Sequence, residues 1–463
     1  MLDTYSELPD AVTKTLQALS KRVREALRGV RSMDLSALER EVGSALGEVG
    51  RAVVAQALSA LDDNGQDVVV DGVRWWQAVR SPQHYMCGFG RVSVERGVYR
   101  AVRNGPTLCP MELRAGIIEG FWTPHAAKVA ALSVSDMTPQ RAEQFFRELG
   151  MMAPSKSSLD RLPKALNERW ESQRELREAQ LRALERVPDG AVSVAVMIDG
   201  VMAPMRDSEK AEKKARTRQQ GRADKGPAGY REVACGALVF YDADGNRLLT
   251  RRMARMPEAH MATLKQQLRA ELQHVLAERP DLIVVALADG AANNWRFLET
   301  LSADYEVVDF YHAAEHLKRA LDVARGASSV TTQRKYHQLR EVLRDEASGV
   351  NKVTRSLVQL RPKASGTARD YRTGVNYFKR HQARMSYAEL QSRNLPIGSG
   401  VIEGTCKSLA SDRLKRAGMR WCSAGGQAIL NLRAWTQSER FDNAWSLLRA
   451  TYAAQVIDFP AAA

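Results

Sequence analysis

The stretch that most constrains the fold of this chain is "LIVVALADGAANNW", residues 282–295. Its unbroken apolar run predicts a strand covered on both faces, because a strand with one wet face alternates apolar and polar residues. Asp289 ends this strand, and Gly290 lets the chain turn toward a helix. Open α/β sheets build their sites at this end of their strands. The alternative is that Asp289 only caps the helix that starts at Ala291.

Two further stretches carry acids in similar settings. "VSVAVMIDG" (192–200) predicts a second buried strand that ends in Asp-Gly, with the acid at Asp199. "NLPIGSGVIEGTCKSL" (394–409) predicts a Gly/Ser turn entering a helix that carries Glu403. Hard divalent cations such as Mg²⁺ prefer carboxylate oxygens. Two such ions roughly 4 Å apart can flank a phosphodiester, so the three acids are candidates for two-metal phosphoryl transfer.

The order of predicted elements from residue 191 onward is β-β-β-α-β-α-β, followed by a helix. The strand that ends at Asp199 is followed by a hairpin over 230–256, an amphipathic helix over 257–277, and the strand that ends at Asp289. This order puts the two aspartates on neighbouring central strands. Adjacent strands lie about 4.8 Å apart, so acids at matching strand ends can share metal ions.

Five stretches occur along residues 191–435 in a defined order: "MIDGVMAPMR", "YREVACGALVF", "LADGAANNW", "DFYHAAEHL" and "LPIGSGVIEGTCKSL". Together they resemble bacterial insertion-sequence transposases of the D-D-E type, closest to the Kra-type family and its Mutator-like relatives. The resemblance implies an α/β fold with a ribonuclease H-like mixed sheet and an all-helical insertion. It also implies that Asp199, Asp289 and Glu403 are catalytic and hold two Mg²⁺ (or Mn²⁺) ions.

Composition indicates the class of partner. The 463 residues carry a formal net charge of +14 and a pI near 9.6, which favours a polyanion, nucleic acid first, over a basic but inert surface. Five scattered cysteines suit a reducing compartment. The polar opening "MLDTYSELPD" predicts no signal peptide, and no apolar run approaches membrane-spanning length. We therefore expect a cytoplasmic, nucleoid-associated protein without a membrane partner.

The patterns predict six segments. They are N-terminal helices (1–62), a small β region (63–122), a helix-turn-helix-like bundle with a linker helix (123–190), the first part of the catalytic domain (191–318), a helical insertion (319–394), and the last catalytic helices (395–463). Within the β region, residues 90–105 alternate and contain a turn glycine, which predicts a hairpin.

The β region bears on metal content. In the family this region is a zinc ribbon with paired cysteines, but only His84 and Cys87 remain of the pattern, and Cys109 is isolated. A structural zinc needs four nitrogen or sulfur ligands. We therefore predict no zinc, and a ribbon held by aromatic side chains instead: Trp75, Trp76, Phe89 and Tyr99.

Candidate DNA contacts lie in five places. Lys156 and Arg161 are on the last helix of the bundle, which can equally be a structural three-helix bundle. His312 follows Asp309 in "DFYH" and either contacts DNA or simply starts a helix that Asp309 caps. Basic and aromatic residues are interleaved in the insertion and follow Glu403, a pattern that suits DNA backbone and end contacts: Arg380, Arg384, Lys407, Arg420 and Trp421. The basic stretch 208–229 is either a DNA-binding loop or a solvated extension.

The predicted function is DNA transposition: metal-dependent cleavage at transposon ends and 3′-hydroxyl strand transfer into target double-stranded DNA, by a homodimer or higher oligomer. Two alternatives stay open. One is a domesticated DNA-binding protein without transposition activity, and the other is a metal-dependent nuclease of the same fold.

Overall fold

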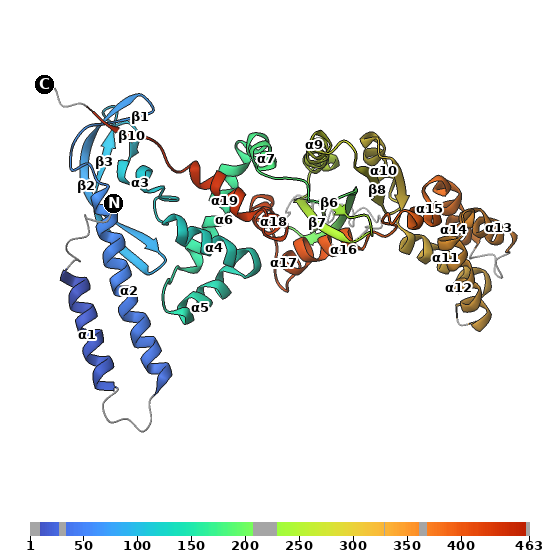
Figure 1. Ribbon diagram of the computed structural model, residues 1–463, viewed down its shortest axis with the longest axis horizontal. Helices are drawn as coiled ribbons and strands as arrows, with labels where there is room; N and C mark the ends of the chain where they lie inside the picture. The colour runs from blue at the N-terminus through green and yellow to red at the C-terminus, as the bar shows by residue number, and fades with distance from the viewer. Residues whose placement is uncertain (1–9, 27–33, 207–228, 328, 361–367, 460–463) are drawn as a thin grey trace, which may run out of the picture. The chain divides into compact units, whose positions relative to one another are not determined.

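The computed structural model describes residues 10–26, 34–206, 229–327, 329–360 and 368–459, which form two compact units. Unit 1 comprises residues 1–178 and 441–463, and unit 2 comprises residues 179–440. Both units mix helices with one sheet, so the predicted α/β class is confirmed at that level (Figure 1). The sequence assigned 441–463 to the catalytic domain, whereas these residues belong to unit 1.

The sheet of unit 1 is wholly antiparallel, in the order β10-β1-β2-β3-β4. It is built from a long ribbon and three short strands: β1 (Val68–Val70), β2 (Val73–Cys87), β3 (Gly90–Arg100), β4 (Thr107–Leu108) and β10 (Val456–Asp458). Because β10 pairs with β1, the C-terminal end of the described chain completes the N-terminal sheet. This pairing explains why the tail belongs to unit 1.

The β2–β3 ribbon corrects two expectations. Residues 90–100 form one strand that pairs with β2 across a turn at Gly88 and Phe89, and a separate turn at 101–104 leads to the short strand β4. Gly97 is no turn residue, because its N–H donates to Asp62 Oδ1 at 3.1 Å from within the strand. Of the four aromatic residues expected to hold the ribbon, Tyr99 is buried with Trp75 packed nearby, but Trp76 and Phe89 are 40% and 37% exposed.

Helices make up the rest of unit 1. They are α1 (Asp10–Ala26), α2 (Leu35–Ala60), α3 (Pro110–Ala115), α4 (Pro124–Asp136), α5 (Pro139–Leu149), α6 (Lys156–Glu171) and α19 (Phe441–Ala450). The three predicted helices of the bundle are confirmed as α4 to α6, with the predicted caps. Thr138 Oγ1 accepts the Arg141 N–H at 3.1 Å, and Gly150 ends α5 at a φ of 70°. Helix α7 (Arg174–Ala183) leads into unit 2.

Unit 2 is organised on a five-stranded mixed sheet in the order β7-β6-β5-β8-β9. Its strands are β5 (Ser193–Pro204), β6 (Tyr230–Tyr241), β7 (Arg247–Arg255), β8 (Ile283–Ala288) and β9 (Tyr305–Val308). The first three are antiparallel neighbours, whereas β8 and β9 run parallel to β5. The predicted β-β-β-α-β-α-β order is confirmed, and β5 and β8 are adjacent.

Helices cover this sheet and enclose its core. They are α9 (Ala262–Glu278), α10 (Ala292–Leu298), α11 (Phe310–Arg325), α16 (Gly400–Thr405), α17 (Asp412–Leu414) and α18 (Ser423–Gln437). Helix α9 packs on β6 and β7, α18 packs on β7, and α16 packs on β5 and β6. Residues 194–198 of β5 and 284–288 of β8 are buried, as their continuous apolar runs predict.

The predicted insertion is helical throughout its described residues. Its helices α12 (Val330–Asp345), α13 (Gly349–Gln359), α14 (Ala368–Arg380) and α15 (Tyr387–Ser392) pack on α11 and on one another. The insertion is therefore part of unit 2 and not a separate unit. None of the helices in the described ranges is long and apolar enough to cross a membrane.

A buried ion-pair network joins four elements of unit 2. Arg440, after α18, binds Glu185 at 2.5 and 2.7 Å and Glu271 of α9 at 2.8 Å. Arg251 of β7 lies 3.4 Å from Glu185 and 3.5 Å from Glu271. Because the two arginines are almost fully buried, each depends on these carboxylates to compensate its charge.

We predict that Glu271→Gln destabilises unit 2. The substitution leaves two buried guanidinium groups with a single carboxylate, which costs about 3 kcal/mol of the free energy of unfolding. The melting temperature should fall by roughly 6–12 °C in a thermal scan. The matched control is Glu315→Gln, which removes an exposed pair with Arg319 at 3.4 Å and should cost less than about 1 kcal/mol. Equal effects of the two variants would contradict the prediction.

Candidate active site

Asp199 and Asp289 come from equivalent positions on adjacent parallel strands. The β5–β8 ladder ends with Met197 opposite Leu287, and each aspartate lies two residues beyond that pair. Strand β8 stops at Ala288, whereas β5 continues past Asp199 to Pro204, paired with β6, so the prediction that the first strand ends at Asp199 is wrong. Asn294 of α10 links the two acid-bearing segments, because its Nδ2 donates to Asp289 Oδ1 at 3.3 Å and to the Ile198 carbonyl at 3.5 Å. The prediction that the two aspartates lie on neighbouring strands of the sheet is thus confirmed.

The local bonds of Asp289 are those of a turn residue, because helix α10 begins after Ala291 without a side-chain cap. Its Oδ1 accepts the Ala291 N–H at 3.0 Å, as expected of a residue that caps the following turn. The indole of Trp295 donates to its backbone carbonyl at 2.6 Å and fixes the strand-to-helix turn. Capping occupies only Oδ1, so a capping role and a ligand role for this carboxylate are compatible.

Asp199 is held in an electrostatically unfavourable position. Its Oδ1 accepts the Gly200 N–H at 2.7 Å, and Oδ2 accepts from Cys406 Sγ at 3.7 Å. Burial, and secondarily the negative charge of Asp289, raises the pKa of Asp199 above its ordinary value, against the opposing effects of these hydrogen bonds and of His312. A cation placed between the two aspartates would relieve this repulsion.

Glu403 reaches the same region from α16, which begins where the sequence predicted. Ser399 precedes the helix, and its hydroxyl donates to Glu403 Oε1 at 2.9 Å. One turn later Cys406, which contacts Asp199, begins a π-helical turn (Cys406–Ser411) that packs on β5. Such turns are rare and frequent at functional sites. The helix and its π-helical turn therefore hold Glu403 against the strand that carries Asp199, and Cys406 contacts that carboxylate directly.

His312 and Asp309 occupy the remaining side of the site. Asp309 is fully buried and accepts the backbone N–H groups of His312, at 2.6 Å, and Ser399. It therefore caps α11, as one reading of the sequence proposed. His312 Nδ1 lies 3.4 Å from Asp309 Oδ1 and 4.0 Å from Glu403 Oε1. Its interaction with Asp309 raises the pKa of His312 to about 9, so the imidazole is protonated at neutral pH.

Two sets of metal ligands are conceivable. Within the described ranges, one set of three metal-binding side chains brings its ligand atoms within 4.8 Å of one another, and it comprises Asp309, His312 and Glu403. In that set Asp309 already accepts the backbone N–H groups of His312 and Ser399, and His312 would have to release its proton to coordinate an ion. The predicted set of Asp199, Asp289 and Glu403 offers the carboxylate oxygens that Mg²⁺ prefers, but it does not meet that distance limit.

Tyr377 of the insertion is a site neighbour that the sequence did not single out for the site. It stacks on His316 with ring centroids 3.8 Å apart and covers Gly290, next to Asp289. A Cβ on Gly290 would lie 2.5 Å from Tyr377 Cε2. The Tyr377 hydroxyl is buried without a hydrogen-bond partner in the described structure. No local pattern connects these residues, because the contact arises only when α14 packs on α11.

The predicted DNA contacts fall into three groups. Arg384 pairs with Glu299 at 2.5 Å and Glu306 at 2.7 Å and lies over Trp295, so its charge is compensated within the fold. Trp421 is half-buried, and its indole donates to the Leu414 carbonyl at 3.0 Å. The remaining predicted cations have exposed side chains: Arg380, Lys407 and Arg420 in unit 2, Lys156 and Arg161 in unit 1. Most of the predicted basic loop 208–229 lies outside the described residues.

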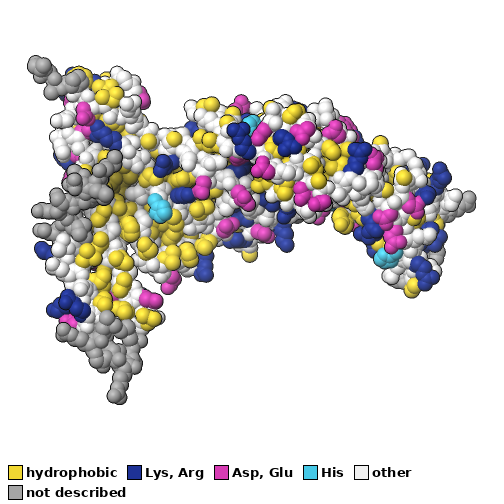
Figure 2. All heavy atoms as spheres, viewed as in Figure 1, with side chains coloured by type: hydrophobic (Ala, Val, Ile, Leu, Met, Phe, Trp, Pro, Cys, Tyr) yellow, Lys and Arg dark blue, Asp and Glu magenta, His cyan; other side chains and the backbone are white. Residues whose placement is uncertain are grey.

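Charge is dispersed on the face shown in Figure 2, where Lys and Arg side chains alternate with Asp and Glu. In the region where the family resemblance implied a zinc ribbon, Cys87 and Cys109 belong to an apolar cluster, whereas His84 is exposed. Burial raises the pKa of both thiols, which disfavours the thiolate form that binds zinc. The absence of zinc stays a prediction.

Comparison with known proteins does not extend this picture. No model of a protein family matches the chain, and a search of curated proteins finds no significant match.

We predict a pH dependence of stability from His312 in protein freed of metal with EDTA. The folded pKa of about 9 exceeds the ordinary 6.5, so the stabilisation is fully present below about pH 6.5 and is lost as pH rises through 9. His312→Gln should lose less stability than the wild type in melting scans between these limits. His337→Gln, at an exposed histidine, is the control and should follow the wild type. Identical pH profiles for all three proteins would refute the raised pKa.

We predict that Gly290→Ala strains the contact with Tyr377. The new methyl group overlaps the ring and should lower the free energy of unfolding by about 1–3 kcal/mol. In a Tyr377→Ala background the same substitution should cost less, which a double-mutant cycle measures. Gly404→Ala is the control, because a Cβ there meets nothing within 4 Å. Additive effects of the two substitutions would argue against the contact.

Proposed function

We propose that the chain is a D-D-E transposase that cuts DNA at transposon ends and joins the freed 3′-hydroxyl to target DNA. The observation that carries the proposal is the equivalent position of Asp199 and Asp289, each two residues beyond the last pair of the parallel β5–β8 ladder, with the Glu403 helix packed on β5. Phosphoryl transfer by two metal ions requires acids on rigid elements in this kind of arrangement.

The order of strands supports a ribonuclease H-like assignment for the sheet of unit 2. Three antiparallel strands are followed by two strands parallel to the first, and the first strand lies in the centre. The helical insertion between β9 and α16 agrees with the resemblance to insertion-sequence transposases.

The metal ions belong to the proposal through the chemistry of the donors. Asp199, Asp289 and Glu403 would hold Mg²⁺ or Mn²⁺, and the raised pKa of Asp199 indicates a position that gains from a cation. Bound ions of this kind activate water and neutralise charge on the attacking and leaving oxygens.

The chain's own residues would position the reacting groups. Ser399 orients Glu403 through Oε1, and Asn294 and Ala291 orient Asp289 through Oδ1, so these two acids each keep an oxygen available for ligation. Protonated His312 adds positive charge beside the acids, where it would favour approach of a phosphodiester. In each step a new P–O bond forms as another breaks, and no covalent protein intermediate is needed.

The proposal also identifies the substrate, the oligomeric state and the cellular location of the protein. Double-stranded DNA is the substrate, and the pairing of two transposon ends implies at least a homodimer. The protein would act on the nucleoid in the cytoplasm. A nuclease of the same fold shares the cleavage step and lacks strand transfer, and a domesticated DNA-binding protein lacks both.

We predict that Glu403→Gln abolishes strand cleavage and leaves DNA binding intact. Loss of one metal ligand removes several kcal/mol of transition-state stabilisation, a rate decrease of roughly 10³-fold or more. The assay incubates duplexes from the genomic flanks of the reading frame with Mg²⁺ or Mn²⁺ and follows nicking, strand transfer and DNA binding separately.

The control for this experiment is Glu341→Gln, at an exposed glutamate of α12, which should cleave like the wild type. Unimpaired cleavage by Glu403→Gln would remove the glutamate from the mechanism. Cleavage without strand transfer would favour the nuclease, and binding without either reaction, together with no terminal inverted repeats in the flanks, would favour the domesticated protein.

A further inference from the structure

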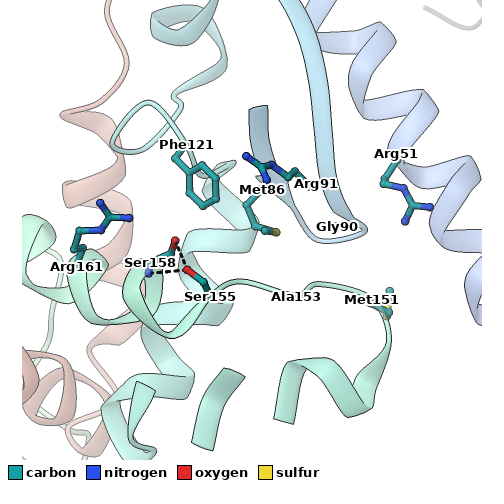
Figure 3. Close-up of a pocket in the computed structure, with 10 residues that line it drawn as sticks. All are labelled: Arg51, Met86, Gly90, Arg91, Phe121, Met151, Ala153, Ser155, Ser158 and Arg161. Carbon is teal, nitrogen blue, oxygen red and sulfur yellow. Dashed lines mark hydrogen bonds between the residues drawn. The ribbon is translucent and has the colours of Figure 1, made fainter. Parts of the chain in front are cut away.

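Unit 1 contains a hollow that lies outside the candidate active site. Its cavity volume is about 590 Å³, within the usual range of roughly 300–1,000 Å³ for ligand pockets. Its lining residues come from α2, the turn end of the β2–β3 ribbon, the loop before α4, the segment between α5 and α6, and the first turns of α6 (Figure 3). The "arginine hollow" is defined by Arg51, Arg91 and Arg161 together with Ser155 and Ser158.

The charge of the arginine hollow is uncompensated. None of the ten residues that line it is acidic, and no ion pair joins Arg51, Arg91 or Arg161 to a carboxylate within the described ranges. Arg51 Nη1 donates only to the Phe89 carbonyl, at 2.9 Å, and Arg161 Nε donates to the Ser157 carbonyl at 3.3 Å. Three like charges around one cavity raise its affinity for an anion.

Several other arginines of the same unit do have acid partners. Four arginines on β2, β3 and α3 each pair with a carboxylate: Arg74 with Asp67 at 2.6 Å, Arg80 with Asp62 at 2.7 Å, Arg96 with Glu112 at 2.8 Å, and Arg114 with Asp63. The ribbon and its neighbours thus place acids beside these four arginines and none beside the arginines of the hollow. Positive charge without a carboxylate partner is available to bind an anion.

Backbone and hydroxyl groups add donors at the same place. Ser155 caps α6, a helix of 16 residues, and accepts the Ser158 N–H at 3.2 Å. The two serine hydroxyls are 3.1 Å apart and lie between the arginines in Figure 3. The start of a helix of this length carries partial positive charge, which favours an anion beside the arginines.

Apolar side chains complete the lining. Met86, Phe121 and Met151 line the hollow alongside the cations. A free inorganic phosphate has no apolar surface to place against them, whereas the deoxyriboses that flank a phosphodiester do. Gly90, at a φ of +115°, keeps this side open, because a Cβ there would lie 3.2 Å from the Met151 carbonyl.

We propose that the arginine hollow binds backbone phosphate of duplex DNA and anchors unit 1 to it. The inference extends the earlier prediction for Lys156 and Arg161, because it adds Arg51 and Arg91 from elements outside the helical bundle. This inference rests on the proposed function in one respect, because that function identifies the bound polyanion as DNA. Backbone contacts position a protein and carry no base sequence, so we expect the hollow to bind any duplex.

The salt dependence of DNA binding tests the proposal. Full-length protein in EDTA, where no cleavage occurs, is titrated onto a fluorescent 30-base-pair duplex of arbitrary sequence over a range of salt concentrations. Each phosphate contact contributes about 0.9 to the slope of log K against log salt, so Arg91→Gln with Arg161→Gln should reduce that slope by about 2. Arg91→Lys with Arg161→Lys keeps the charges and should keep most of the slope.

The matched control removes the same charge elsewhere in unit 1. Arg24→Gln with Arg103→Gln changes two exposed arginines that do not line the hollow and should leave the slope unchanged. All variants should melt like the wild type, since the substituted side chains on α1, β3, α6 and the turn after β3 are exposed.

Three results would overturn the proposal. They are an equal loss of slope in the control, an unchanged slope in the hollow variant, and no duplex binding by the wild type. Saturable heat with inorganic phosphate, lost in the hollow variant without a change in DNA affinity, would assign the hollow to a small phosphate ligand. Because no result depends on catalysis, failure here is separate from failure of the Glu403→Gln experiment.

Discussion

The repulsion between two carboxylates just beyond the β5–β8 ladder is the constraint on which the candidate site depends. The parallel register gives Asp199 and Asp289 equivalent positions, and the partial burial of Asp199 weakens the screening of its charge by water. A sheet that keeps such a pair needs positive charge nearby. In the described structure this comes from His312, which Asp309 holds in its protonated form. A divalent cation would supply the same compensation more strongly, so the arrangement is consistent with a metal site that forms around ions.

The elements around the aspartates are placed by packing over long sequence distances. Cys406 contacts Asp199 because α16 passes into a π-helical turn against β5, and Ser399 contacts buried Asp309 at the start of the same helix. The insertion is involved as well, because Tyr377 of α14 lies over Gly290. The glycine after Asp289 therefore has a packing reason beyond the turn. Because Tyr377 contacts Gly290, a shift of α14 would displace the turn that carries Asp289. The insertion therefore helps to hold this part of the site in place.

Strong local patterns explain what the sequence could predict. The apolar runs before Asp199 and Asp289, the cap at Thr138 and the start of α16 are encoded within a few residues, and the structure has them. Long-range partners are not encoded in this way. Gly97 resembled a turn residue because its partner, Asp62, is distant in sequence. Arg384 resembled a DNA contact because Glu299 and Glu306 lie far upstream, and the pairing of β10 with β1 depends on strands at opposite ends of the chain.

The distribution of arginine partners carries more functional information than the net charge. A charge of +14 indicates a polyanion without saying where it binds, and several arginines of both units are already neutralised by buried or neighbouring acids. Arginines that have carboxylate partners within the fold contribute mainly to its stability. Arginines that line a cavity without such partners keep their field available to a ligand. On this criterion, unit 1 would bind an anion where α2, the β2–β3 turn and α6 meet. The candidate catalytic acids, by contrast, lie in unit 2.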